Sequence, residues 1–217
     1  MIPEGAWEEI QEFWSEGIPK SAFCRVRGEN VGYRCWDETG QLTMEYGLRN
    51  NQMHGCFRTW YSNGMLWEES YYLEGKEHGI AKQFNDQGEL IGTYQMNYGT
   101  GVDLWYQEKG LLAEERHYQN GERHGYERWW NGNNQTIYRE QHFQQGIEHG
   151  IHREWNQKGR LRRGFPKYFV KGEKVTLVQY LKACSQDESL PKYLESDNDW
   201  RRLPPREAGK QSRAFTE

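Results

Sequence analysis

Four histidines recur at one position of a repeating pattern, and histidine is the side chain most often found as a metal ligand. Each stands directly before a glycine; they are His54, His78, His124 and His149. If each repeat forms two strands, equivalent side chains of neighbouring repeats lie about 10 Å apart. The ligands of one zinc ion lie only about 3 to 4 Å from each other. We therefore predict no metal site and a structural role for these histidines in the turns.

Two further repeating positions carry acids and bases, which form ion pairs or, at close range, acid–base catalysts. The acidic positions are Glu45, Glu69, Glu115 and Glu140. The basic positions, two residues before an aromatic, are Arg34, Arg58, Lys82, Arg128 and Arg153, with Leu104 as the exception. If Tyr61 faces Leu66 across its turn, Arg58 falls opposite Glu69, and such cross-strand pairs are stabilising. The main interpretation is a row of ion pairs; the alternative is a charged strip that a partner recognises.

Sequence signatures of catalytic and cofactor sites are absent. The patterns GxSxG, GxGxxG, HExxH and the P-loop do not occur in the chain. These patterns place nucleophiles, phosphate-binding backbone or zinc ligands where the chemistry requires them. The spacing of about 10 Å between ladder glutamates also exceeds the roughly 5 to 9.5 Å between paired glycosidase carboxylates. We expect no enzyme activity, no catalytic residue and no cofactor.

The elements that position these residues follow from a repeat of 22 to 25 residues. Glycines open the copies: Gly32, Gly55, Gly79, Gly101, Gly125 and Gly150. Within a copy, two short runs rich in Tyr, Trp and Thr are separated by turn sequences such as Asn63-Gly64. Such turns require positive φ and are typical of β-hairpins. One copy cannot bury its apolar side alone, so the pattern predicts an elongated single-sheet array of about six antiparallel β-hairpins, an all-β fold.

Three stretches of this repeat resemble the MORN repeat, in the bacterial variant of YwqK-like antitoxin or immunity proteins. They are Trp-Tyr-Ser-Asn-Gly-Met-Leu at 60–66, Tyr-Leu-Glu-Gly-Lys-Glu-His-Gly at 72–79 and Tyr-Gln-Asn-Gly-Glu-Arg-His-Gly at 118–125. The similarity covers residues 32–163. It implies a hairpin array and, as function, neutralisation of a toxin by direct binding. MORN proteins are also linked to acidic phospholipids, which makes a membrane-associated scaffold the alternative.

Composition narrows the class of protein. The mean hydropathy of −1.11 is very low, yet 15% of the residues are aromatic, which a thin sheet with stacked rings explains. The net charge of −4 argues against nucleic acid and an anionic membrane as partners. No apolar run approaches 18 residues and no signal peptide is visible. We therefore expect a cytoplasmic protein with reduced thiols at Cys24, Cys35, Cys56 and Cys184.

The ends of the chain differ from the repeat. At residues 3–16, Trp7, Ile10 and Trp14 are spaced as on one face of a helix, which predicts a helix that caps the array or binds a partner. Residues 168–175 indicate a last hairpin, and Thr176 is a candidate N-cap for a helix that continues to about Cys184. The predicted segments are a capping helix at 1–20, the repeat array at 21–163, a hairpin–helix cap at 164–190 and an extended or flexible tail at 191–217.

In that tail, the last dozen residues are expected to be flexible. Trp200 and the Arg201-Arg202 pair either dock back on the sheet or serve as a linear motif.

Aromatic residues outside the common repeat positions are the candidate anchors for a partner, because interface hot spots are enriched in Trp and Tyr. They are Trp67, Tyr71, Tyr94, Trp105 and Trp129. Together with the four ladder glutamates they form the predicted partner-binding set, on the concave face of the sheet. The prediction is a non-catalytic module that binds a protein, with a toxin as the narrower hypothesis. A regulatory module that works with an enzyme in another chain is the third possibility, and the oligomeric state stays open.

Overall fold

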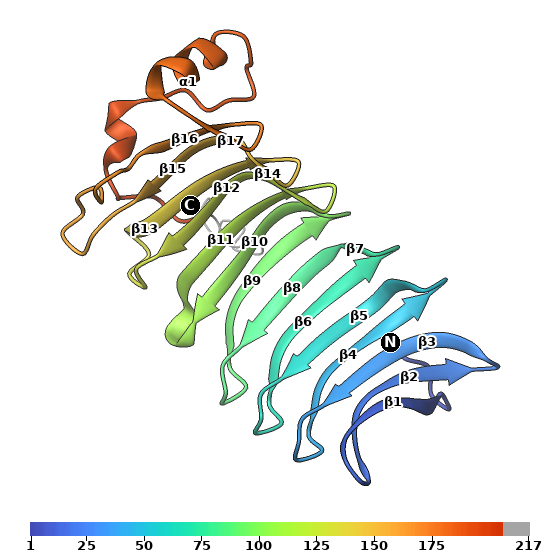
Figure 1. The fold of residues 1–217 in the computed structure, drawn as a ribbon. Coiled ribbons are helices and arrows are strands. Elements are labelled where there is room, and N and C mark those ends of the chain that lie inside the picture. Colours follow the sequence, from blue (N-terminus) through green and yellow to red (C-terminus); the bar gives the residue numbers. More distant parts are fainter. Residues whose placement is uncertain (206–217) are drawn as a thin grey trace, which may run out of the picture. The chain divides into compact units, whose positions relative to one another are not determined.

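The computed structural model describes residues 1–205, which form 17 β-strands, one α-helix and two short 3-10 helices (Figure 1). Residues 206–217, where flexibility is predicted, lie outside the described part of the chain. The described part of the chain divides into two compact units, residues 1–99 and residues 100–205. In both units consecutive strands pair antiparallel, so the predicted all-β hairpin array is confirmed.

The first unit contains nine strands. They are β1 (Trp7–Ser15), β2 (Ile18–Val26), β3 (Glu29–Trp36), β4 (Leu42–Arg49), β5 (Gln52–Trp60), β6 (Leu66–Leu73), β7 (Lys76–Glu77), β8 (Gly79–Phe84) and β9 (Leu90–Asn97). The turn between β5 and β6 illustrates how the sequence ends each strand. Gly64 has φ +83°, and the Asn63 side chain accepts a hydrogen bond of 3.0 Å from the Met65 backbone N–H. Asn and Gly are the residues that such a turn requires.

The register of β5 and β6 places Arg58 opposite Glu69, as predicted. The reason differs from the prediction. Trp60, not Tyr61, faces Leu66, and the register shifts by one residue between Thr59 and Trp60. This bulge restores the pairing of Arg58, because a one-residue shift moves a side chain to the other face of a sheet.

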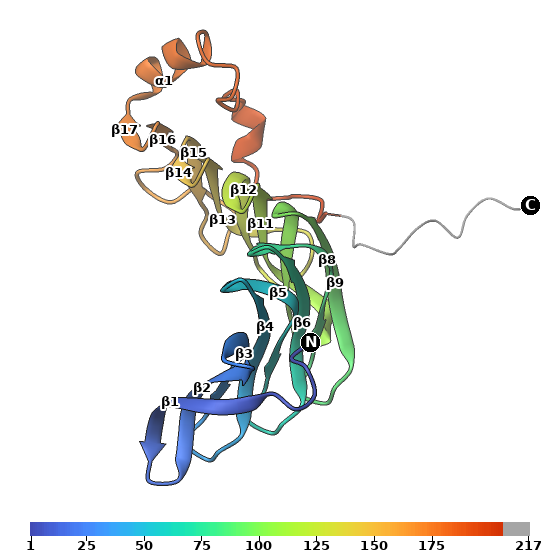
Figure 2. The same cartoon turned by 90° about the vertical axis from the view of Figure 1, so that its right-hand side faces the viewer.

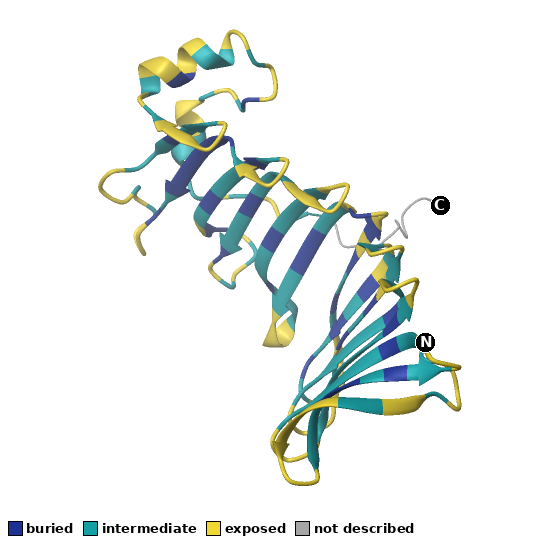
Figure 3. Ribbon diagram, turned by 45° about the vertical axis from the view of Figure 1, so that its right-hand side comes forward, coloured by how far each residue is buried: buried dark blue, intermediate teal, exposed yellow. Residues whose placement is uncertain are grey.

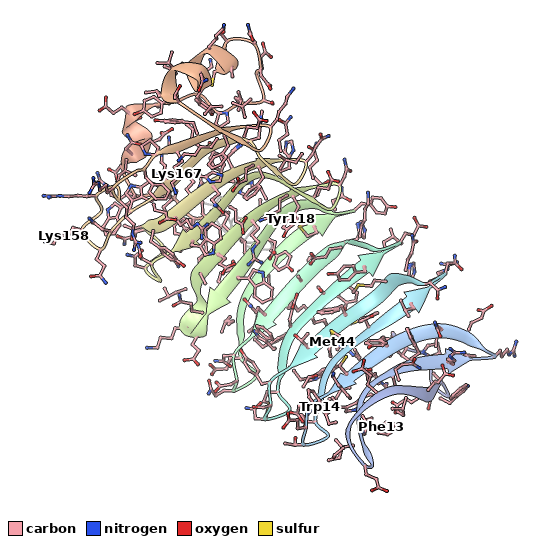
Figure 4. All side chains as sticks on the ribbon, viewed as in Figure 1. Phe13, Trp14, Met44, Tyr118, Lys158 and Lys167 are labelled. Carbon is pink, nitrogen blue, oxygen red and sulfur yellow. The ribbon has the colours of Figure 1, made fainter. Side chains whose placement is uncertain are left out.

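The predicted N-terminal helix is wrong, and so is the boundary of the segment 1–20. Residues Trp7–Ser15 form strand β1, which pairs with β2 through a turn at Gly17 (φ +82°). Two ion pairs join these strands, Glu9 to Arg25 at 2.6 Å and Glu12 to Lys20 at 2.8 Å. Helical spacing of the apolar residues could not reveal these partners, since they belong to β2. Phe13 and Trp14 project from β1 (Figure 4).

The residues before β1 lie against the sheet of the first unit (Figure 2). A Cβ atom on Gly32 would stand 2.4 Å from Ile2 Cγ1, closer than real atoms approach. Glycine at this position therefore leaves the room that the Ile2 side chain occupies.

The second unit contains eight strands. They are β10 (Thr100–Gln107), β11 (Leu111–Gln119), β12 (Glu122–Trp130), β13 (Ile137–Gln144), β14 (Ile147–Glu148), β15 (Gly150–Glu154), β16 (Lys167–Val170) and β17 (Glu173–Val175). A 3-10 turn, η1 (Glu108–Gly110), joins β10 to β11. Buried residues occupy the middle of the strands and exposed residues the turns (Figure 3).

The predicted hairpin and helix at the C-terminal side of this unit are confirmed. Strands β16 and β17 form the hairpin, and helix α1 (Leu177–Cys184) begins after the N-cap Thr176. Thr176 and Gln179 form a capping box, in which each side chain binds the backbone N–H of the other residue. Helix α1 buries Tyr180 against Tyr168 and Ile151 of the sheet. A 3-10 helix, η2 (Glu195–Asn198), follows further along the chain.

Candidate functional site

A row of alternating charges runs across the strands of the first unit, and we name the side of the sheet that carries it the ladder face. The row consists of Arg34, Glu45, Arg58, Glu69 and Lys82, each directly opposite the next in the strand pairing. Arg34 Nε lies 3.2 Å from Glu45, Arg58 Nη2 lies 2.7 Å from Glu69, and Lys82 Nζ lies 3.6 Å from Glu69. The predicted row of cross-strand ion pairs is thus confirmed in this unit.

Two of the predicted anchor residues are exposed on this ladder face. Trp67, Glu69 and Tyr71 alternate along β6 and therefore share one side of the sheet. Trp67 is 37% and Tyr71 is 40% exposed, and the Tyr71 hydroxyl donates a 3.2 Å hydrogen bond to Glu69 Oε1. The ring of Trp67 packs at 5.9 Å from that of Tyr61. The sheet thus presents two partly fixed aromatic rings beside a charged row.

The corresponding row of the second unit is buried. It consists of Glu115, Arg128, Glu140 and Arg153. Arg128 Nε lies 2.8 Å and Arg153 Nη1 lies 2.9 Å from the carboxylate of Glu140. Glu115 and Glu140 are only 1% exposed, so their assignment to the partner-binding set is wrong. Burial prevents either carboxylate from contacting a partner at the surface.

The chain itself covers this buried row. Residues 194–203, which we name the C-terminal strap, cross the ladder face of the second unit. Arg202 lies 3.3 Å from Glu140 through both Nε and Nη2, and the Asn198 carbonyl accepts a 2.7 Å hydrogen bond from Trp155 Nε1. The Trp200 carbonyl accepts a 2.9 Å hydrogen bond from the Ile137 backbone N–H. Of the two alternatives predicted for this segment, docking back on the sheet is therefore confirmed.

Three further predicted anchors are less available than expected. Tyr94 is 6% exposed on the side of β9 away from the ladder face, so its assignment is wrong. Trp105 is half-buried and donates to Asp103 Oδ2 at 3.2 Å. Trp129 is half-buried with the Arg139 guanidinium 4.8 Å from its ring centre. Their positions outside the repeat pattern did not predict exposure, because strand alternation places Tyr94 on the buried side.

The electrostatics follow burial and pairing. Burial alone would raise the pKa of Glu140, but the positive charges of Arg128 and Arg202 have the larger, opposite effect. The pKa of Glu140 therefore lies below its ordinary value. Burial also raises the pKa of Glu69, but the hydrogen bonds from Arg58 outweigh this effect and bring that pKa below its ordinary value. On the other side of the second unit, burial raises the pKa of Asp103 to about 6. Glu69 and Glu140 are therefore both ionised near neutral pH and pair with arginine as carboxylates.

The repeated histidines act at turns in two of the four cases. The Tyr98 backbone N–H donates to His78 Nδ1 at 3.1 Å, and the Lys171 N–H donates to His149 Nδ1 at 3.0 Å. The equivalent nitrogen atoms of His54 and His124 are buried without a hydrogen-bond partner among the described residues. In residues 1–205 no group of three His, Cys, Asp or Glu side chains is arranged to hold a metal ion.

The four cysteines are free thiols. Burial raises the pKa of Cys24 and Cys56, which keeps both protonated near neutral pH.

Comparison with known proteins does not assign this chain to a family. No family model and no curated protein matches this chain. The MORN resemblance therefore stays a prediction from the sequence. Within the described residues no helix has the length and apolar character needed to span a bilayer.

Proposed function

We propose that the chain is a non-catalytic protein-binding module whose contact surface is the ladder face of the first unit. The observation that supports this most is the pair Trp67 and Tyr71, which are 37% and 40% exposed on either side of Glu69. Exposed Trp and Tyr rings with limited side-chain freedom contribute most of the binding energy in many interfaces. The rings are already held by Tyr61 and by Glu69, so a partner orders little more on binding.

The charged row beside these rings supplies specificity. Arg58 and Glu69 pair with each other while 28% and 12% of their side chains stay exposed, so a partner can approach both charges. Complementary charges raise the association rate and exclude unsuitable partners, and this effect weakens with salt. Toxin neutralisation in the cytoplasm is the narrower proposal, which rests on the MORN resemblance alone.

A paired substitution tests the surface. The double variant Trp67→Ala/Tyr71→Ala should lose a stoichiometric partner in affinity purification from the native cell, and binding to the unmodified chain should weaken at about 0.5 M salt. Tyr138→Ala is the matched control, since Tyr138 is an exposed ring in the second unit. Unchanged capture by the double variant would refute this surface, as would loss of its β-sheet circular dichroism, which would mean that the rings are structural.

Phospholipid association is the alternative. The row and its neighbour Glu8 balance three bases, Arg34, Arg58 and Lys82, against three acids. Such a balanced surface gives little attraction to anionic lipid. Co-sedimentation of the chain with phosphatidylserine vesicles at physiological salt would favour this alternative over protein binding.

A further inference from the structure

One set of five residues occurs in both units with the same residue types in the same pairing. In the first unit it is Arg34, Trp36, Glu45, Arg58 and Trp60. In the second unit it is Arg128, Trp130, Glu140, Arg153 and Trp155. In both sets the glutamate lies directly opposite an arginine on each neighbouring strand. Because the strand pairing is the same, the two sets present the same chemical groups on their ladder faces.

The set in the second unit binds an arginine. The Arg202 guanidinium places Nε 3.3 Å from Glu140 Oε2 and Nη2 3.3 Å from Oε1. It also lies 5.7 Å from the ring centre of Trp155. Asn198 of the strap is bound as well: its backbone carbonyl accepts a hydrogen bond from Trp155 Nε1 at 2.7 Å, and its side-chain Oδ1 accepts one from Arg153 Nε at 3.3 Å. The Glu140 carboxylate, already paired with two arginines, thus binds a third guanidinium through two N–H groups. That guanidinium also lies within cation–π distance of an indole ring.

The set in the first unit has the same groups without that third guanidinium. Among residues 1–205, the basic groups near Glu45 are Arg34 at 3.2 Å and Arg58 at 3.8 Å. The Glu45 side chain is 19% exposed, whereas that of Glu140 is 1% exposed. Trp36 and Trp60 are half-buried, whereas Trp130 and Trp155 are buried. The first-unit set is therefore more accessible to solvent than the set that Arg202 covers in the second unit.

The space beside the set is filled in both units, by different means. Next to Arg128 the second unit has Tyr126, whose ring lies 4.3 Å from that guanidinium. The equivalent position next to Arg34 is Gly32, over which Ile2 packs. The N-terminal segment thus replaces the missing ring, and the Arg–Glu–Arg row keeps its lateral support without being covered as it is in the second unit.

We propose that the first-unit set binds an arginine side chain that an extended segment of a partner protein presents, as the second unit binds Arg202 of its own strap. This proposal rests on the proposed protein-binding function and names the chemistry of the partner. The guanidinium binds the Glu45 carboxylate through two N–H groups and lies within cation–π distance of the Trp60 ring. Lysine fits poorly, because its ammonium is a point charge that offers neither the planar fork nor the stacking surface.

The strap sequence itself is the probe. A fluorescent peptide of residues 194–203 is titrated into the full-length chain and followed by anisotropy. The Arg202→Ala peptide should bind about ten-fold more weakly, because the charge-assisted hydrogen bonds and the cation–π contact are lost. The Arg201→Ala peptide is the matched control with the same change in charge. It should bind like the parent peptide, since Arg201 is 76% exposed and pairs with Asp199 of the strap. Equal affinities of the two variant peptides would overturn the proposal.

Substitutions in the chain locate the site. Glu45→Gln and, as a second variant, Trp60→Leu should each weaken binding of the parent peptide about ten-fold. Glu38→Gln, in the exposed turn after β3, is the control. Binding that survives Glu45→Gln in a folded chain means that the peptide exchanges with the strap in the second unit, which overturns the proposal. Absence of any peptide binding also overturns it but leaves the test of Trp67 and Tyr71 unaffected, so the two proposals can fail separately.

Discussion

The two units carry the same residue types in their charged rows, but the row is partly exposed in the first unit and covered in the second. Around Glu45 in the first unit, two arginines and two half-buried tryptophans remain open to solvent. Around Glu140 in the second unit, the same residue types lie beneath the C-terminal strap and receive Arg202. Ion pairs at a surface contribute little to stability, whereas a buried charge is costly to leave unpaired. One repeat motif is therefore part of the structural core where the strap covers it, and stays partly exposed where no strap covers it, which is where we propose that a partner binds.

The opposite faces of the sheets differ as well. In the first unit this face carries the neighbouring rings of Tyr33, Tyr46 and Phe57. The ring centre of Tyr46 lies 5.4 Å from that of Tyr33 and 6.4 Å from that of Phe57. The equivalent positions of the second unit are Glu127, Gln141 and His152. Of these, Glu127 and His152 are buried. Aromatic stacking in one unit thus corresponds to polar groups in the other, which should make the stability of the second unit depend on pH.

The largest expected difference between the units comes from removing the central glutamate. Glu140→Ala leaves the buried guanidinium of Arg153 and the partly buried ones of Arg128 and Arg202 without their carboxylate, and should lower the free energy of unfolding by about 3–5 kcal/mol. Glu45→Ala removes a partly exposed carboxylate and should cost about 1 kcal/mol or less. Urea denaturation of both variants measures the contrast. Similar losses would mean that covering the row by the strap has no energetic consequence.

Acid should weaken the second unit through His152. Burial lowers the pKa of His152 to about 4, whereas the unfolded chain titrates near 6.5. Between these two pKa values the native state binds fewer protons than the unfolded chain. The contribution of neutral His152 to the free energy of unfolding is therefore fully present above pH 6.5 and is lost as the pH falls towards 4. The loss amounts to about 3 kcal/mol. His152→Phe, which introduces the residue type of position 57, should remove this part of the acid sensitivity in unfolding curves from pH 7 to 4. The same pH slope in both proteins would contradict the assignment.

Removing the strap's anchor should have a moderate effect. Arg202→Ala eliminates the charge-assisted contacts to Glu140 and should lower the free energy of unfolding by about 2 kcal/mol. Limited proteolysis should then cleave residues 194–203 faster. Arg201→Ala is the control and should change stability by no more than about 0.5 kcal/mol, because that side chain is exposed. Equal protection of the strap in both variants would show that Arg202 is not its anchor.

The smallest expected effect concerns a turn of the first unit. His78→Ala removes the acceptor of the Tyr98 N–H, but water can replace it at this exposed position. We expect a loss of about 0.5–1 kcal/mol. Amide hydrogen exchange at Tyr98 should speed up, while exchange at Lys171, which binds His149, should not change. Unaltered exchange at Tyr98 would argue against the turn role of this histidine.

Much of the fold and part of the site could be predicted from local sequence. Asn63-Gly64 fixes a hairpin turn because few other residues adopt its backbone angles, and Thr176 with Gln179 marks the start of α1. Exposure was predicted for both Trp67 and Tyr94, and the structure confirms it for Trp67 but buries Tyr94. Both lie outside the common repeat positions, and only the register of β9 decides that Tyr94 faces the buried side.

The sequence by itself determined the repeat and the antiparallel hairpins, because turn residues and strand alternation act over a few neighbouring positions. It also predicted that Arg58 lies opposite Glu69, although a bulge produces this pairing in the structure. Only the tertiary structure decided that Trp7–Ser15 is a strand, since its ion-pair partners lie on β2. It also decided which ladder is buried. Glu45 and Glu140 occupy the same repeat position between two arginines, and a strap whose Arg202 lies 62 residues from Glu140 in the chain covers only Glu140. Local sequence patterns do not predict which distant segment of the chain will cover a given surface.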